Sequence, residues 1–302
     1  MADQHGEGHL PVDELMRTTP PMDMSVAAAL LQEAKEIMDQ HGVVFFLRQG
    51  TCLGAVRDNS FIPWDDDLDI GSIEGLHGFD DRVIGPVADT FRDRGFDVSQ
   101  ARVDGDTWVG VTKNHVRIDW TIYRIRQHHI VHYPSVRIPI RLFTDLKEIN
   151  FVGDRYLVPN PPEEYLAHKY GPDWMVPKQT GYAKDVVDNV PAGSMPGNPG
   201  KLLRFLMTGV LRWRVARLRI LDGAGEPVRG AEVTVVGWGE YQTDRSGCAR
   251  LYLPRDDVYA LVVRRGELEE VLYEEQMQPS KSYVYRPDPR TSEGRIFVLE
   301  QE

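Results

Sequence analysis

Four aspartates crowd into one short segment of the chain. Residues 64–70 have the sequence WDDDLDI, with Asp65, Asp66, Asp67 and Asp69 inside five positions. Carboxylates at such close range repel one another strongly unless cations neutralise their charge. Hard divalent cations, which prefer oxygen ligands, are the simplest neutralising partners. The segment therefore predicts a metal site.

The alternation of this segment gives the site a geometry. A strand over residues 64–70 places Asp65, Asp67 and Asp69 on one face and Asp66 on the other face, together with the apolar residues. Asp67 and Asp69 then project to the same side, two positions apart, and can hold metal ions between them.

A third carboxylate of the same character is Asp119. It lies in VRIDWTIY, residues 116–123, where polar and apolar residues alternate. Two aspartates on one strand and a third on a neighbouring strand form a metal-binding triad, which orients phosphates, shields their charge and activates an attacking hydroxyl. The alternative is a structural ion pair between Asp119 and Arg117.

The elements around these residues follow from apolar spacing and turn residues. The apolar run 43–47 predicts a buried strand that leads into a tight turn at Gly50 and Thr51, followed by a helix over 52–57. The backbone N–H groups of Gly50 and Thr51 and the start of this helix would lie near a bound phosphate. The alternative is a strand-to-helix turn without a binding role. Further helices are expected over 25–41, 79–95 and 162–170, and strands over 108–112 and 116–123.

Taken together, these motifs resemble the LicD/fukutin family of phosphotransferases, which belongs to the nucleotidyltransferase superfamily. The matching residues are Gly50, Thr51, Leu53, Gly54, Arg57, the run FIPWDDD at 61–67, Asp69, Pro162, Tyr165, Leu166, Tyr170, Gly171, Trp174 and Pro177. The resemblance covers residues 25–178. It implies transfer of a phosphorylated alcohol from a CDP-linked donor, such as CDP-choline or CDP-ribitol, to a hydroxyl of a sugar or glycan precursor, with release of CMP.

The resemblance also implies roles for individual residues. The catalytic and metal-binding residues are expected to be Asp67, Asp69 and Asp119, and the substrate-binding residues Gly50, Thr51, Arg57 and Asp65. Two divalent cations, Mg²⁺ or Mn²⁺, bridge the donor diphosphate, and Asp119 also serves as the base. Asp65 holds a second cation or orients the other ligands. Arg57 meets the diphosphate or is a plain counter-charge.

The last third of the chain predicts a different architecture. Period-two alternation broken by glycine-rich turns is typical of a small antiparallel sandwich. The residues Asp222, Gly223, Gly225, Pro227, Val228, Gly230, Ala231, Val233, Val235, Thr243, Asp244 and Gly247 resemble the carboxypeptidase-regulatory-like sandwich, a transthyretin-like fold. That resemblance implies a structural role, or binding of a glycan or a partner, and no catalysis.

The expected organisation has four parts. A flexible arm over 1–22 precedes an α/β (α+β) domain of nucleotidyltransferase fold over 23–200. A connecting helix over 201–214 then leads to a small all-β sandwich over 215–302. Residues 201–219 mix basic and apolar side chains, which fits either a domain-packing helix followed by a strand or a peripheral contact with a membrane surface.

Composition excludes several classes of function. The chain of 302 residues has 35 Lys+Arg against 46 Asp+Glu, a net charge of −11, which argues against a nucleic-acid partner. Two cysteines are too few for a disulfide scaffold. With no leader pattern and no long apolar run, we expect a cytoplasmic protein without a transmembrane segment.

Two other functions remain open. One is a nucleotidyltransferase that moves a nucleoside monophosphate from a triphosphate and releases pyrophosphate. The other is a non-catalytic protein whose sandwich binds a glycan or a partner while the aspartates only hold metal. The intact set of aspartates favours an enzyme.

Overall fold

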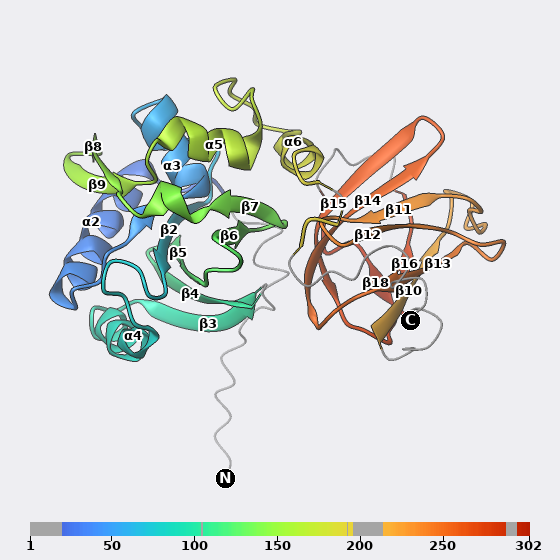
Figure 1. Ribbon diagram of the computed structural model, residues 1–302, viewed down its shortest axis with the longest axis horizontal. Helices are drawn as coiled ribbons and strands as arrows, with labels where there is room; N and C mark the ends of the chain where they lie inside the picture. The colour runs from blue at the N-terminus through green and yellow to red at the C-terminus, as the bar shows by residue number, and fades with distance from the viewer. Residues whose placement is uncertain (1–19, 104, 192, 196–213, 288–294) are drawn as a thin grey trace, which may run out of the picture.

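The computed structural model describes residues 20–103, 105–191, 193–195, 214–287 and 295–302. We call the described residues up to 195 the first lobe and those from 214 onward the second lobe; they lie side by side (Figure 1). The first lobe is mixed α/β and the second is β-rich, which confirms the predicted fold class at this level. Most of the predicted arm and nearly all of the connecting helix lie outside the described residues, so the domain boundaries stay predictions.

A five-stranded sheet forms the centre of the first lobe. Its order is β1-β2-β5-β4-β3, and β2 and β5 are parallel whereas the other neighbours are antiparallel. The strands are β1 (Phe46–Leu47), β2 (Asp67–Ile73), β3 (Asp97–Val103), β4 (Asp106–Lys113) and β5 (Val116–Tyr123). Two further hairpins are β6 (His129–His132) with β7 (Val136–Pro139), and β8 (Lys147–Phe151) with β9 (Asp154–Val158).

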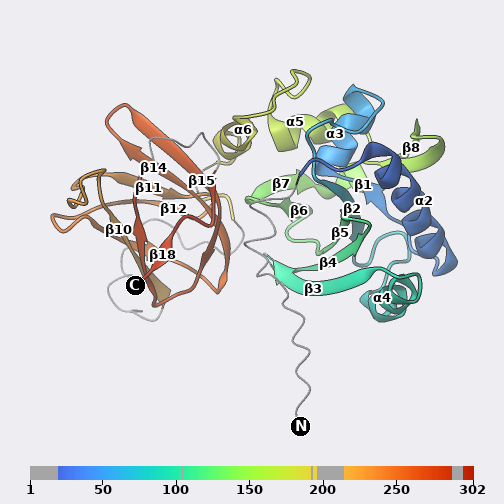
Figure 2. The same ribbon diagram turned by 180° about the vertical axis from the view of Figure 1, so that it is seen from behind.

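Helices surround this sheet (Figures 1 and 2). They are α2 (Met24–Gln40), α3 (Gln49–Arg57), α4 (Ile84–Asp93), α5 (Pro162–Tyr170) and α6 (Tyr182–Asp188), with short 3₁₀ turns η1 (Asp81–Val83) and η2 (Ile140–Phe143). Helix α2 contacts α4 and β5, whereas α3 contacts β2 and α5. The helices predicted over 25–41 and 162–170 and the strand predicted over 116–123 are confirmed.

The two central strands are buried on one face and polar on the other. Leu68 on β2 and Ile118 on β5 are fully buried, whereas Asp69 and Asp119 are half-buried. The predicted alternation therefore holds for both strands. The hairpin that joins β4 to β5 turns at Asn114 and His115, whose φ angles of 52° and 62° are those of a two-residue turn matching the strand twist.

Two local predictions around the site are wrong. Helix α3 begins at Gln49 and not at Cys52, so Gly50 and Thr51 lie inside its first turn. The sharp change of direction falls one residue earlier, at Gln49, whose φ is +41° and whose backbone N–H donates to Tyr165 Oη at 2.8 Å. Strand β2 begins at Asp67 and not at Trp64, so period-two alternation does not apply to the residues before it.

The second lobe consists of two sheets that share one core. Their orders are β13-β10-β16-β18 and β12-β11-β14-β15-β17, and buried apolar residues of both sheets form a single cluster, as in a β-sandwich. The strands are β10 (Val215–Ile220), β11 (Glu232–Val235), β12 (Gly239–Gln242), β13 (Cys248–Tyr252), β14 (Asp257–Arg265), β15 (Leu268–Met277), β16 (Ser282–Tyr285), β17 (Arg295–Ile296) and β18 (Glu300–Gln301).

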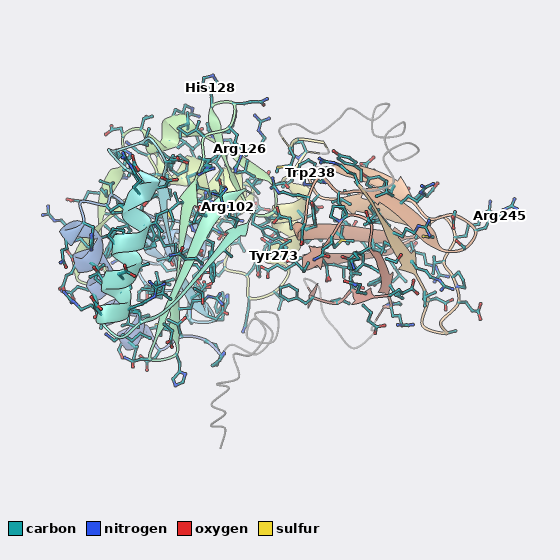
Figure 3. The ribbon with its side chains drawn as sticks, turned by 90° about the horizontal axis from the view of Figure 1, so that it is seen from below. Arg102, Arg126, His128, Trp238, Arg245 and Tyr273 are labelled. Atoms are coloured by element: carbon teal, nitrogen blue, oxygen red, sulfur yellow. The ribbon has the colours of Figure 1, made fainter. Side chains whose placement is uncertain are left out.

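The two lobes are packed against each other through apolar contacts. Val236, Val262, Val271 and Tyr273 of the second lobe belong to the same hydrophobic cluster as the core of the first lobe. Figure 3 shows Tyr273 where the two lobes meet. Burial of apolar side chains across this junction stabilises one arrangement of the lobes.

Candidate active site

A cavity of about 1240 Å³ lies between the two lobes. On the side of the first lobe it is lined by the predicted aspartates of β2 and β5 and by the start of α3. On the side of the second lobe it is lined by residues of β15 and of the segments beside it. The predicted site residues that line the cavity are Gly50, Arg57, Asp65, Asp67, Asp69 and Asp119.

The parallel pairing of β2 with β5 brings the predicted carboxylates together. In this register Asp67 pairs with Arg117, and Asp69 pairs with Asp119. The Arg117 guanidinium donates to Asp67 Oδ2 at 2.5 Å and its Nε lies 3.0 Å from Asp119 Oδ1. Arg117 therefore bridges two of the carboxylates, so the ion pair weighed as an alternative for Asp119 is present within the cluster itself.

A second buried arginine neutralises Asp69. Arg48, only 4% exposed, places a guanidinium nitrogen 2.8 Å from Asp69 Oδ1 and donates through Nε to the Ile70 carbonyl at 3.0 Å. The backbone N–H of Gly50 donates to the other oxygen, Asp69 Oδ2, at 3.2 Å. Asp69 is thus held on both oxygens, with its position fixed by the turn between β1 and α3.

Thr51 fastens the helix to the strand. Its side-chain oxygen accepts a hydrogen bond from the backbone N–H of Asp69 at 2.8 Å, and the residue is almost completely buried. This contact positions β2 against α3. Contact of Gly50 and Thr51 with a phosphate stays a prediction. For Thr51 that contact would be made by the backbone, because the hydroxyl already accepts the hydrogen bond from Asp69.

The carboxylates of Asp65, Asp66 and Asp67 approach one another closely. One carboxylate oxygen from each of the three lies within 4.8 Å of the others, a spacing that could hold a metal ion. Among the described residues, the predicted set Asp67, Asp69 and Asp119 does not form a group this close. The expectation that Asp66 faces the opposite side is wrong, because β2 begins only at Asp67. Asp65 Oδ2 is buried and has no hydrogen-bond partner among the described residues. An all-oxygen set with an unsatisfied carboxylate fits a hard divalent cation.

Burial and mutual repulsion raise the pKa values of these carboxyls. Burial, aided by Asp67 and Asp69, raises the pKa of Asp65 well above its usual range. Burial also raises the pKa of Asp69 to about 6, although Arg48 opposes the shift. For Asp119, burial outweighs the neighbouring Arg117 and raises the pKa to about 8. Ionised carboxylates are therefore costly in this site despite Arg48 and Arg117, and a bound cation would stabilise them.

These shifts predict how stability depends on pH. The folded pKa values exceed the unfolded value of about 3.9, so the folded chain binds more protons than the unfolded chain between about pH 4 and 8. In EDTA, the free energy of unfolding is expected to fall as pH rises through that window. Mg²⁺ binds the ionised carboxylates, so it is expected to raise Tm more at about pH 8 than at about pH 5. Thermal melts in EDTA and in Mg²⁺ test this, and equal Mg²⁺ shifts at both pH values would contradict it.

Gly50 leaves room for the Asp65 carboxylate. A Cβ added at Gly50 would lie 2.5 Å from Asp65 Oδ2, whereas one added at Gly85 on α4 meets nothing within 4 Å. Gly50→Ala is expected to displace the carboxylate and weaken Mg²⁺ binding about tenfold, with stability changed by less than about 1 kcal/mol. Calorimetric titration with Mg²⁺ measures this, and Gly85→Ala is the matched control. Unchanged affinity in Gly50→Ala would exclude Asp65 from the cation site.

Arg57 lies at the end of α3 and lines the cavity. Its Nε donates to Asp58 Oδ1 at 2.9 Å, and a terminal nitrogen lies 2.7 Å from Asp58 Oδ2. The counter-charge partner of Arg57 is therefore the adjacent residue. Its contact with a diphosphate stays a prediction.

Three residues of the site escaped the sequence analysis. Lys169 on α5 is buried and donates to the Tyr133 carbonyl; burial lowers its pKa to about 7, against the pull of Asp69. Trp108 on β4 lies across Gly110, the residue paired with Asp119. Glu274 on β15 reaches the cavity from the second lobe, and burial raises its pKa to about 7. Trp108 shares a face of β4 with Gly110, so strand alternation could have identified it. No sequence signal places Glu274 at the cavity.

The fold and the site define a class of protein. It has a mixed α/β lobe whose two central parallel strands carry carboxylates into a deep cavity, closed on one side by a β-rich lobe. Buried oxygen ligands of this kind suit metal-assisted chemistry on phosphates. Among the described residues, no helix is long and apolar enough to span a membrane. Cytoplasmic location and membrane-surface contact stay predictions, the latter because most of residues 201–219 lie outside the description.

Comparison with known proteins finds a family that matches part of the chain. Residues 42–161 match the family described as LicD/FKTN/FKRP, nucleotidyltransferase domain. This stretch is therefore similar to the LicD family, in agreement with the resemblance that the sequence predicted. The mouse and human proteins named ribitol 5-phosphate transferase FKRP are each 29% identical to the chain over 171 residues. The match covers 52% of this chain and 33% of each relative, so the chain spans about a third of their length.

Two other similarities are shorter or weaker. Uncharacterized protein RP689 of Rickettsia prowazekii (strain Madrid E) is 43% identical over 42 residues, which cover 14% of this chain and 16% of that protein. A crystal structure of ANT(2")-Ia in complex with adenylyl-2"-tobramycin is similar over 35% of this chain and 54% of that chain, with 13% identity and a TM-score of 0.27. That score is too low to support an argument about the fold.

Proposed function

We propose that the chain transfers a phosphorylated alcohol from a CDP-linked donor to a hydroxyl of a sugar or glycan precursor and releases CMP. The observation that carries this proposal is the register of β2 and β5, which sets Asp67 and Asp69 beside Arg117 and Asp119 at the cavity. This carboxylate cluster lies inside the segment that matches the LicD family. Since the curated relatives are named for ribitol 5-phosphate, we propose that alcohol first.

The aspartates of β2 and the preceding turn would hold the divalent cations. Asp65, Asp66 and Asp67 approach one another closely, and Asp69 lies next along the strand. Mg²⁺ or Mn²⁺ in this position would neutralise the donor diphosphate and stabilise the leaving phosphate. Arg48 and Arg117 keep the carboxylates fixed through their ion pairs, so little reorganisation is needed when substrate binds.

Asp119 is the proposed base. The oxygen of the acceptor hydroxyl forms a bond to phosphorus while the phosphoanhydride bond to CMP breaks, and the hydroxyl proton passes to Asp119 and then to solvent. Burial raises the pKa of Asp119 to about 8, so the carboxyl is mostly protonated at neutral pH in the free site. A bound cation would favour the ionised form, which accepts the proton. Arg117 Nε, 3.0 Å from Asp119 Oδ1, orients the carboxylate and favours its ionised form.

The proposal is tested by ³¹P NMR of the full chain with Mg²⁺. The donors are CDP-ribitol, CDP-choline and nucleoside triphosphates, each with and without a pool of sugar acceptors. CMP release that requires Mg²⁺ and one CDP-linked donor is the expected result. Pyrophosphate release from a triphosphate would contradict it and favour a nucleotidyltransferase. Sugar binding without turnover of any donor would favour a non-catalytic protein.

A further inference from the structure

The second lobe supplies one wall of the cavity. Tyr273 and Glu274 of β15 line the same cavity as the β2 aspartates. Neighbouring residues of a regular strand point to opposite faces, but β15 is irregular here. Tyr259 of β14 pairs with Glu275, and Leu261 pairs with Leu272, so Tyr273 and Glu274 together oppose the single residue between Tyr259 and Leu261. This is a β-bulge, a device that redirects side chains and is frequent beside active sites.

Contacts from the first lobe hold the bulge in place. The hydroxyl of Tyr133 donates to the Tyr273 carbonyl, and the Tyr273 ring packs edge-on against Tyr133, with centroids 5.5 Å apart. The ring of Tyr182 on α6 packs against Tyr273, with centroids 5.8 Å apart. On the other side, the backbone N–H of Phe297 donates to the Glu274 carbonyl at 2.7 Å. The backbone of Glu274 is therefore fixed from both lobes.

The acidic side chains of this wall differ in whether they already have a hydrogen-bond or ion-pair partner within the protein. Glu275 accepts hydrogen bonds from the backbone N–H groups of Val298 and Leu299. Asp257 is paired with Arg255 at 2.5 Å. The carboxylate of Glu274 lines the cavity. Among the described side chains it forms no hydrogen bond or close ion pair, and Arg117 acts on it only as a nearby charge. A half-buried carboxylate that lines a cavity and lacks a partner is an available acceptor for a ligand hydroxyl.

Charge decides which part of the substrates faces this wall. Glu274 adds negative charge to this wall, although Arg117 lies near enough to favour its ionised form. A donor diphosphate therefore lies toward the aspartates and their cations instead. The remaining substrate is the acceptor. We propose that β15 forms the acceptor wall of the site, where Glu274 accepts a hydrogen bond from a hydroxyl of a neutral sugar or polyol and disfavours phosphorylated acceptors. This assignment rests on the proposed function and makes the second lobe part of the active site.

The test uses the full chain and the isosteric variant Glu274→Gln. Glu267→Gln, an exposed substitution at the hairpin between β14 and β15, is the matched control. CMP release is followed with Mg²⁺, first with water alone as acceptor and then with increasing neutral sugar. Glu274→Gln is expected to raise the acceptor KM about tenfold, as for loss of a hydrogen bond to a charged group. Glu267→Gln is expected to keep its acceptor KM, its donor KM and its cleavage of donor by water within about twofold of the parent chain.

A second experiment, which measures ligand binding without turnover, distinguishes this inference from the proposed function. Saturation-transfer NMR compares glucose, galactose and ribitol with their phosphates, on the parent chain and on both variants. The inference predicts that the neutral compounds bind in preference to their phosphates and that Glu274→Gln weakens them selectively. Equal binding of the phosphates, no binding of neutral compounds, or an unchanged acceptor KM would overturn it. Glu274-dependent sugar binding without cleavage of any donor would reject the proposed function and leave the sugar-binding wall standing.

Discussion

Asp67→Asn is expected to lower the rate of CMP release on the order of 10³-fold while the chain stays folded. Asp67 belongs both to the close set of three carboxylates and to the ion pair with Arg117. Asparagine keeps the volume and one carbonyl oxygen but removes the charge, so the cation is held less tightly and the donor diphosphate is less well neutralised. Steady-state kinetics by ³¹P NMR with saturating Mg²⁺ measures the effect.

The control for Asp67→Asn is the same substitution at Asp93, an exposed residue at the end of α4. Asp93→Asn is expected to leave the rate unchanged. Circular dichroism and thermal melts establish that both variants are folded. Activity within about tenfold of the parent chain in a folded Asp67→Asn protein would show that the carboxylate cluster does not carry the reaction. Asp69→Asn is expected to behave similarly, with a greater loss of stability because that carboxylate neutralises Arg48.

Arg48→Met is expected to lower the free energy of unfolding by about 3–5 kcal/mol. Arg48 lies under the site, where it pairs with Asp69 and donates to the Ile70 carbonyl. Removing it leaves a buried carboxylate without its arginine, and an uncompensated buried charge is far costlier than a lost surface pair. Urea denaturation in EDTA measures the change.

Arg92→Met provides the control for this substitution. Arg92 pairs with Asp89 at 2.7 Å on the exposed side of α4, so its removal is expected to cost less than about 0.5 kcal/mol. The loss in Arg48→Met is expected to be smaller at low pH, because protonation of Asp69 removes the uncompensated charge. A loss under about 1 kcal/mol at neutral pH would contradict the view that Arg48 is the main counter-ion of Asp69.

Sequence periodicity was sufficient to predict the polar face of the site. Asp67, Asp69 and Asp119 share a face because a strand repeats every two residues, and the structure sets β2 and β5 side by side in matching register. The same rule failed for Asp66, which precedes the strand. It did indicate the pair of Arg117 with Asp119, two positions apart on one strand. It could not reveal that Arg48 pairs with Asp69 or that Arg117 also reaches Asp67, since these pairs depend on tertiary distances that spacing does not encode.

The contribution of the second lobe could not be predicted from local patterns. Glu274 lies in an acidic strand segment without a distinctive motif, more than 150 residues after Asp119 in the sequence. Its place in the cavity depends on the bulge in β15 and on how the lobes pack. A bulge changes the strand pairing by one residue without a distinctive sequence. The packing of the two lobes depends on how their folded surfaces fit together, which local sequence patterns do not describe. Both lie beyond what alternation can predict.

The two-residue turn between β4 and β5 has a consequence for genetic experiments. Asn114 and His115 set the register of β5 against β4. That register determines which residue of β4 lies opposite Arg117 and which lies opposite Asp119. A slip by one position would exchange the polar and apolar faces of the strand. In a loss-of-function screen, a codon inserted or deleted at this turn would therefore score as severely as loss of a catalytic aspartate, although it changes no residue that lines the cavity.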